Sequence, residues 1–215
     1  MKSFLWIGGV VVVGIVLMLV GRGGASIEPP FELGVIHPQD NIKGLAVSQG
    51  AAASSTVVLM EYSDFQCPAC RSYYPVLRQI MTEFGDRITF VFRHFPLSSI
   101  HMNAEFAARA AEAAKKQGKF WEMHDLLFEK QDEWAKANDV ETIFKNYAIL
   151  LDISVDQFVV DWKSKEVKDF VRAQRTHATK SGLQGTPTFF LNGKQIQNPA
   201  SLEAFRALVL SELAK

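Results

Sequence analysis

The feature that most constrains the fold of this chain is a pair of cysteines, Cys67 and Cys70, set between a predicted strand and a predicted helix. They are the only two cysteines in 215 residues, too few for a scaffold of disulfides. Residues 56–62 (TVVLMEY) are apolar and β-rich, which is typical of a buried strand. Pro68 then stands where proline is favoured, in the first turn of a helix. The two thiols are therefore expected one turn apart at a helix start, within reach of each other.

This spacing predicts a redox-active dithiol. Cys67, at the helix N-terminus, faces unpaired backbone N–H groups and the positive end of the helix dipole. Both favour the thiolate, which is the attacking form of a cysteine. Cys70, one turn further in, is expected to be more buried. It suits the second step of exchange, in which a thiol resolves the mixed disulfide that Cys67 forms with a client protein.

Other uses of the pair are weaker interpretations. A zinc site needs about four ligands, and the pair supplies two. The five histidines form no ligand-spaced pair, so no metal site is predicted. Haem attachment needs a histidine directly after Cys70, where Arg71 stands. A static disulfide remains an alternative, although it closes a very short loop and so stabilises little.

The remaining pattern predicts an α/β fold with a long helical stretch. A helix is expected from Cys67 to about residue 84, kinked at Pro75 and ending at Gly85. A second buried strand follows over residues 88–93, and strand–helix–strand implies a parallel pair. Apolar stripes at helical spacing cover residues 103–181, with a capping box at Ser154-x-x-Gln157. Further along the chain, a strand at 188–191, an Asn-Gly turn, residues 194–197 and a helix at 201–214 predict a hairpin followed by a final helix.

The N-terminus predicts export. Phe4 to Val20 is an uncharged apolar run that as a helix spans about 26 Å, against a bilayer core of about 30 Å. We interpret residues 1–24 as a single-pass membrane anchor, with a cleaved signal segment as the alternative. Residues 25–55, rich in Pro and small residues, are interpreted as a tether, and residues 56–215 as the domain. Either interpretation places the domain outside the cytoplasm, at the cell membrane or secreted.

Charge argues against nucleic acid as a partner. The chain holds 23 basic and 23 acidic residues, a formal net charge of zero. Binding to phosphate backbones rests on clustered Lys and Arg, and a neutral chain is a poor candidate for it.

Four separated motifs resemble the DsbA-like thiol–disulfide oxidoreductases of the thioredoxin superfamily. The resemblance covers about residue 40 to the C-terminus. The motifs are residues 58–70 (VLMEYSDFQCPAC), 93–97 (RHFPL), 117–128 (QGKFWEMHDLLF) and 185–193 (GTPTFFLNG).

The resemblance implies a thioredoxin fold with an inserted all-helical subdomain over about 103–181. It also implies that Glu61 is a buried carboxylate beneath the active site, where it exchanges a proton with Cys70. Thr186 and Pro187 match the loop with a cis proline that faces the cysteines and holds a client backbone.

Residues around the cysteines are expected to contact clients. We assign to this surface six residues: Phe65, Gln66, Pro68, Ala69, Thr186 and Pro187. Tyr62 and Asp64 are expected to ring the active site, with exposed aromatic rings forming a client-binding patch and the Asp64 carboxylate opposing the Cys67 thiolate. His94 and His101 are interpreted as structural or surface residues.

The expected activity is dithiol oxidation of reduced or misoxidised client proteins, without a cofactor. The resemblance also implies a membrane redox partner, a quinone-linked oxidase or reductase. Two features favour a moderate oxidant: no histidine stands between the cysteines, and Thr186 precedes the proline. Alternatives are a disulfide isomerase or reductase, a membrane-tethered chaperone-like binder without enzymatic activity, and metal delivery through the two thiols.

Overall fold

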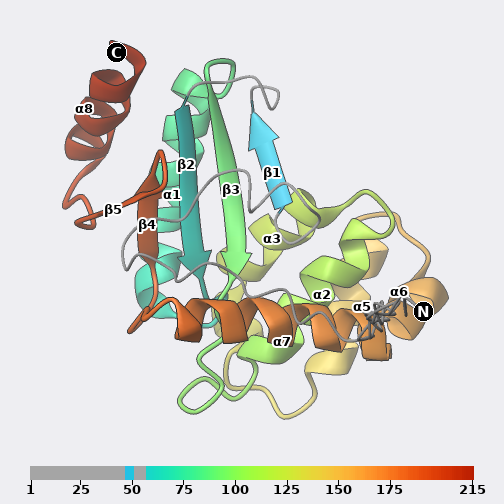
Figure 1. Ribbon diagram of the computed structural model, residues 1–215. Coiled ribbons are helices and arrows are strands. Elements are labelled where there is room, and N and C mark those ends of the chain that lie inside the picture. Colours follow the sequence, from blue (N-terminus) through green and yellow to red (C-terminus); the bar gives the residue numbers. More distant parts are fainter. Residues whose placement is uncertain (1–46, 51–56) are drawn as a thin grey trace, which may run out of the picture. The chain divides into compact units, whose positions relative to one another are not determined.

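The computed structural model describes residues 47–50 and 57–215 (Figure 1). The predicted membrane anchor and most of the predicted tether lie outside these residues. Within the described part of the chain, no helix is long and apolar enough to cross a membrane.

A five-stranded sheet forms the centre of the fold. Its order is β1-β3-β2-β4-β5, and β2 and β3 run parallel, as the strand–helix–strand pattern predicted, while the other neighbouring pairs are antiparallel. The strands are β1 (Val47–Gly50), β2 (Val57–Ser63), β3 (Ile88–His94), β4 (Thr188–Leu191) and β5 (Lys194–Ile196). β1 lies inside the stretch predicted to be tether. Its sequence, VSQG, carries little strand signal, and its backbone pairing with β3 defines it.

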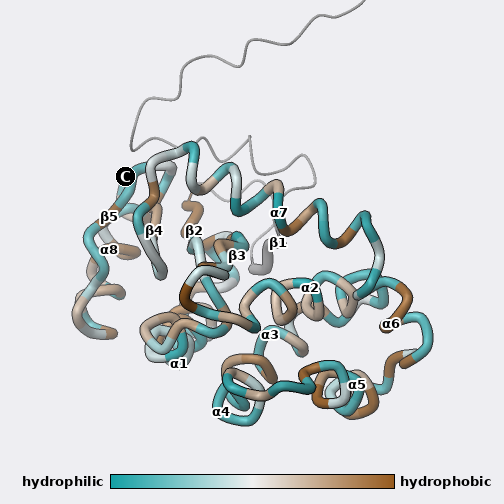
Figure 2. Tube along the Cα trace, turned by 90° about the horizontal axis from the view of Figure 1, so that it is seen from below, coloured by the Kyte–Doolittle hydropathy of each residue, from teal (hydrophilic) through white to brown (hydrophobic). Residues whose placement is uncertain are grey.

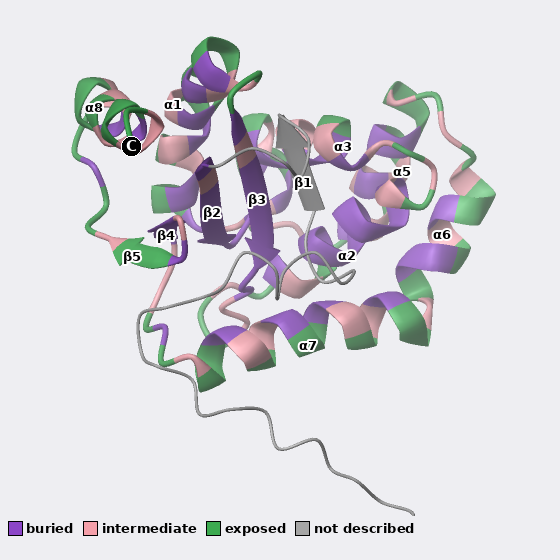
Figure 3. Cartoon of the chain, turned by 45° about the horizontal axis from the view of Figure 1, so that its top comes forward, coloured by how far each residue is buried: buried purple, intermediate pink, exposed green. Residues whose placement is uncertain are grey.

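Side-chain alternation along β2 decides what each face of the sheet receives. Leu59 belongs to the larger core beneath α1 (Pro68–Phe84), while Met60 and Tyr62 belong to a smaller core on the other face. Glu61 has the parity of Leu59, so its side chain lies on the α1 face. Both central strands are buried over nearly their whole length (Figure 3).

Helices cover both faces. α1 packs against β3 and against α8 (Leu202–Leu213), and α8 also contacts β2. On the other face the C-terminal part of α7 (Lys165–Lys180) packs on β3, with Ala178 in the smaller core. α1 runs unbroken through Pro75 to Phe84 and ends before Gly85, where the sequence predicted its end.

The predicted helical insertion is present between β3 and β4. Figure 2 shows α7 running from α6 back towards β4. The chain therefore leaves the sheet after β3 and returns to it at β4. The remaining helices are α2 (Ala104–Lys115), α3 (Phe120–Glu129), α4 (Gln131–Trp134), α5 (Val140–Leu150) and α6 (Val155–Lys163).

The predicted capping box is only half formed. The Ser154 hydroxyl accepts the Gln157 backbone N–H at 3.3 Å, as expected of an N-cap. The Gln157 side chain turns to Asp161 instead of returning to Ser154, and Gln117 accepts the Ser154 backbone N–H. A long-range contact thus replaces the second local bond.

The hairpin between β4 and β5 turns at Asn192 and Gly193, as predicted. Both have positive φ, 50° and 79°, the backbone region that an Asn-Gly turn of this type requires. Asn192 also pairs with Val58 of β2: its side-chain oxygen accepts the Val58 N–H at 2.9 Å, and its own N–H donates to the Val58 carbonyl at 2.9 Å. The turn therefore fixes β4 against the start of β2.

Candidate active site

Cys67 and Cys70 lie at the N-terminus of α1, directly after β2. Cys67 is the N-cap residue, Pro68 opens the helix, and Cys70 follows in the first turn. Both are free thiols, Cys67 7% exposed and Cys70 1% exposed. Cys70 is thus the more buried of the two, as the helix position predicted.

The surroundings of Cys67 stabilise its thiolate. A hydrogen bond from Cys70, together with the Thr186 side chain and the backbone N–H groups of Cys70 and Ala69, lowers the pKa of Cys67 to about 5 against the opposing effect of desolvation. At neutral pH Cys67 is therefore a nucleophile without further activation.

Cys70 has the opposite tendency. Burial raises the pKa of Cys70 well above its ordinary value, and the neighbouring Cys67 and Glu61 raise it further. The two thiols of one helical turn thus differ sharply in acidity.

Glu61 is buried, as the resemblance implied, with 1% of its surface exposed. Desolvation raises the pKa of Glu61 to about 8, although the Ser63 hydroxyl, which donates to Oε1 at 2.7 Å, partly offsets this effect. A carboxyl group with this pKa exchanges protons near neutral pH.

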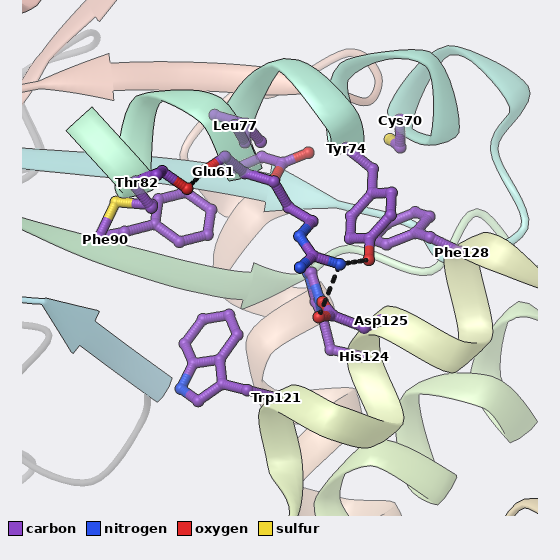
Figure 4. Close-up of a pocket in the computed structure, with 12 residues that line it drawn as sticks. Glu61, Cys70, Tyr74, Leu77, Thr82, Phe90, Trp121, His124, Asp125 and Phe128 are labelled. Carbon is purple, nitrogen blue, oxygen red and sulfur yellow. Dashed lines mark hydrogen bonds and ion pairs between the residues drawn. The ribbon is translucent and has the colours of Figure 1, made fainter. Parts of the chain in front are cut away.

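Glu61 and Cys70 line one cavity of about 240 Å³. Figure 4 shows Tyr74 and Phe128 beside Cys70, with Trp121 and His124 of α3 on the far wall. Arg78, which donates to the Tyr74 hydroxyl at 3.0 Å and lies 3.6 Å from Asp125, supplies charge at the exposed side. The cavity is large enough for several waters and has polar partners for them.

The Thr186–Pro187 peptide bond is cis, as the resemblance implied, and its loop faces Cys67. The Cys67 thiol donates to the Thr186 carbonyl at 3.4 Å, and Asn198 donates to the Pro187 carbonyl at 2.9 Å. Pro187 is buried and Thr186 half-buried. A surface groove runs along residues 182–188 and 195–198, beside this loop.

The other residues assigned to the client surface divide into two groups. Pro68 and Ala69 are exposed beside Cys67, and Gln66 is half-buried with its side-chain amide bonded inward. The assignment of Phe65 was wrong: its ring is 1% exposed and packs on Phe92.

Tyr62 and Asp64 also differ from the prediction. Tyr62 is fully buried on the opposite face of the sheet, because strand alternation turns it away from Glu61, and its ring stacks on His177. The predicted patch of exposed aromatic rings is therefore absent from these positions. The Asp64 carboxylate accepts the backbone N–H groups of Gln66 and Leu97 and bonds His101 at 2.7 Å. It shapes the loop, and other groups dominate the pKa of Cys67.

Two features of the site were not predicted from the sequence. One is a second groove beside Pro68, which has the exposed side chains of Ile100 and Met102 on its rim. These two apolar residues within the polar stretch SSIHMN were the available signal. The other feature is Gln131, which contacts the active-site loop from α4 and has no signal in the sequence. Among the described residues no group of three His, Cys, Asp or Glu side chains is placed to hold a metal ion.

Comparisons with known proteins agree with this geometry. A family model described as thioredoxin matches residues 45–210. A curated relative, the protein named Na(+)/H(+) antiporter NhaA 3 of Salinispora tropica, is 39% identical over 158 residues; the match covers 74% of this chain and 23% of that protein. The chain thus spans about a quarter of the length of this relative.

Two solved structures show the same fold. BdbD from Bacillus subtilis, in its oxidised form, matches with a TM-score of 0.73 and 23% identity, covering 86% of this chain and all of that one. The alpha-DsbA1 protein of Wolbachia pipientis matches with a TM-score of 0.70 and 22% identity, covering 79% of this chain and 91% of that one. The chain belongs to the thioredoxin family and has the DsbA-like form of its fold.

Proposed function

We propose that the protein is an exported thiol–disulfide oxidoreductase that forms disulfides in client proteins through Cys67 and Cys70. The observation that carries this proposal is the opposite acidity of the two thiols, one with a pKa of about 5 and the other with a pKa raised well above normal. Disulfide exchange needs one thiolate that reacts with the client and is a good leaving group, and a second thiol that stays protonated until it resolves the mixed disulfide.

The exchange begins with Cys67 and Cys70 joined as a disulfide. A client thiolate attacks the Cys67 sulfur, the Cys67–Cys70 bond breaks, and Cys70 leaves with the electron pair and takes a proton from Glu61. A second client thiolate then attacks the client sulfur of the mixed disulfide and releases Cys67 as a thiolate. The client loses two electrons to the protein and gains a disulfide.

Reoxidation reverses the electron flow with a different partner. The Cys67 thiolate attacks a disulfide of a membrane redox protein, a quinone-linked oxidase in this proposal, and the S–S bond of that protein breaks and releases its first thiolate. Cys70 gives its proton to Glu61 and attacks the Cys67 sulfur, which restores the Cys67–Cys70 disulfide and releases the second thiolate of the partner. The cavity shared by Glu61 and Cys70 supports this role, because it opens to solvent and is large enough to hold water beside the carboxyl group.

Client contacts are proposed on both sides of Cys67. On one side the cis-proline loop offers the backbone groups of Thr186 and Pro187 to an extended client segment. On the other side Pro68, Ile100 and Met102 offer exposed apolar surface. An anchor over residues 1–24 holds the domain at the outer face of the cell membrane in this proposal.

A trapping experiment tests the exchange. The Cys70→Ser variant is expected to accumulate a mixed disulfide with a model protein whose two cysteines are joined as a disulfide, because Cys67 attacks that disulfide and no Cys70 thiol is left to resolve the product. The Cys67→Ser variant is the matched control and is expected to trap nothing. Equal trapping by both variants, or by neither, would contradict the proposal and favour a non-enzymatic binder.

The reduction potential decides the direction of electron flow. Equilibration with glutathione buffers is expected to give a value of about −120 to −180 mV, the range of proteins that donate or rearrange disulfides. A value of about −270 mV would make the protein a reductase. A pKa of about 5 for Cys67 favours the oxidising range, since it lies below the value of about 7 of a reducing thioredoxin.

A further inference from the structure

The backbone on either side of Gln66 is held by one side chain of the helical insertion. The Gln131 amide donates to the Phe65 carbonyl at 2.6 Å and to the Cys67 carbonyl at 3.3 Å. Gln131 is the first residue of α4 and is only 4% exposed. A residue outside the sheet thus holds the backbone conformation of the loop that carries Cys67.

Two neighbouring amides fix α4 itself to the same loop. Gln66 donates to the Ala135 carbonyl at 2.7 Å and accepts the Asn103 backbone N–H at 2.7 Å. The Asn103 side chain in turn donates to the backbone carbonyls of Trp134, Ala135 and Ala137. We refer to Gln66, Asn103 and Gln131 as the amide clamp.

The amide clamp acts on the atoms that set the acidity of Cys67. Cys67 is the N-cap residue, with φ −71° and ψ 122°, and the backbone N–H groups of Ala69 and Cys70 lower its pKa. The direction of these N–H groups relative to the sulfur depends on the backbone torsions that Gln131 holds. The Gln131 donors also offset the negative ends of two carbonyl dipoles next to the sulfur.

We propose that Gln131 is a positioning residue for thiol–disulfide exchange, acting through the Phe65 and Cys67 carbonyls to keep Cys67 in its nucleophilic state. The proposal rests on the exchange function proposed above, and it adds that the helical insertion tunes the thiol as well as covering it. The competing interpretation is that Gln131 only attaches the insertion to the sheet.

The variant that separates the two is Gln131→Met, which keeps the length of the side chain and removes both donors. The readout is the rate of alkylation of Cys67 by iodoacetamide across pH, which reports its thiolate fraction. We expect the pKa of Cys67 to rise by about one unit, which lowers the alkylation rate at pH 5 about fivefold. A profile unchanged from wild type in a folded variant would overturn the proposal.

The control is Trp134→Phe on the same short helix. It removes the bond from the Trp134 indole to the Leu127 carbonyl, 2.9 Å long, without touching the active-site loop. It is expected to lower the melting temperature and leave the alkylation profile unchanged. A shift equal to that of Gln131→Met would mean that loosening α4 alone moves the thiol, and would equally overturn the specific role of Gln131.

A second variant covers the case in which Gln131→Met does not fold. Gln131→Asn retains the amide and withdraws it by one methylene, so the pKa of Cys67 is expected to move upward by a smaller amount. Alkylation needs neither a client nor a redox partner. Its outcome is therefore independent of whether the wild-type protein oxidises clients in the trapping experiment.

Discussion

The Glu61 carboxyl group is ionisable and is almost completely buried. β2 turns its side chain under α1, and burial raises its pKa to about 8. Glu61 lines the cavity beside Cys70, and this cavity opens to the exterior. Its chemistry is therefore limited to small, mobile species, protons and water.

The Glu61→Gln variant tests the proton transfer. In the wild type, the rate at which Cys70 resolves a mixed disulfide on Cys67 is expected to rise with pH through about 8, as the carboxylate that accepts the Cys70 proton forms. Glutamine accepts no proton, so the rate at pH 8 is expected to fall about tenfold to a hundredfold and to lose this pH dependence. Single-turnover kinetics measure both.

Ser63→Ala is the matched control for Glu61→Gln. The Ser63 hydroxyl stabilises the Glu61 carboxylate and lowers its pKa. Its removal is expected to move the rising limb to higher pH while leaving the plateau rate near that of wild type. If Glu61→Gln kept the wild-type profile, the proton would have to leave Cys70 by another route.

At this scale, residue type and spacing predicted the reactive groups but not every neighbour. The two cysteines follow from their place at a helix start, and Glu61 follows from the resemblance to the DsbA-like oxidoreductases. The predictions for Phe65 and Tyr62 were wrong because an aromatic residue near a reactive cysteine is equally compatible with an exposed client-binding surface and with the buried core. Only the packing of Phe65 on Phe92, far away in the sequence, decides between them.

Among the elements, the β4–β5 hairpin has the clearest physical cause. Asn192 combines positive φ with two hydrogen bonds to Val58 and one from its amide to Glu212 at 2.9 Å. A single residue therefore joins the turn, the central strand and the last helix.

Asn192→Ala is expected to lower the free energy of unfolding by about 2–3 kcal/mol, from backbone strain at positive φ and an unpaired Val58 N–H. Asn192→Gly removes the same side-chain bonds without the strain and is expected to cost less. Urea denaturation measures both. The pKa of Cys67 is expected to stay unchanged, since the turn lies at the opposite end of β4 from Pro187; a shift would show that the hairpin reaches the active site.

Most elements were predictable because their patterns are local. Apolar periodicity predicted the helices over residues 103–181, and the Asn-Gly turn predicted the hairpin. β1 and the amide clamp were not predictable. The first is defined by pairing with β3. The second is built from bonds between the side chains of residues 66, 103 and 131 and backbone N–H and C=O groups, and no side-chain pattern in the sequence indicates such bonds.

For the whole molecule, the low pKa of Cys67 links redox state to stability. The folded pKa, about 5, lies below the ordinary value of 9.0, so the thiolate stabilises the reduced fold. This contribution is complete above about pH 9 and is lost as pH falls through about 5. The disulfide form has no thiolate to contribute.

The difference in unfolding free energy between the reduced and the oxidised protein is therefore expected to grow with pH. Between pH 5 and pH 7 we expect a gain of about 1–2 kcal/mol, allowing for partial solvent screening of Cys67. Urea titrations of both redox forms measure this difference. Glu61 is present in both forms and largely cancels. Parallel pH curves for the two forms, or the same slope in reduced Cys67→Ser, would contradict this linkage.

The alternation of side chains between the two faces of β2 limits which insertions and deletions the protein tolerates during evolution. If the active-site loop keeps its place, an insertion of one residue between Tyr62 and Ser63 exchanges the two faces, which places Tyr62 beneath Cys70 and the Glu61 carboxyl group in the smaller core. In the loops of the helical insertion, a change in length by one residue does not exchange buried and exposed faces in this way. In related proteins with the same chemistry, we therefore expect the loops between the helices to vary in length. We expect the number of residues from Glu61 to Cys70 to stay the same.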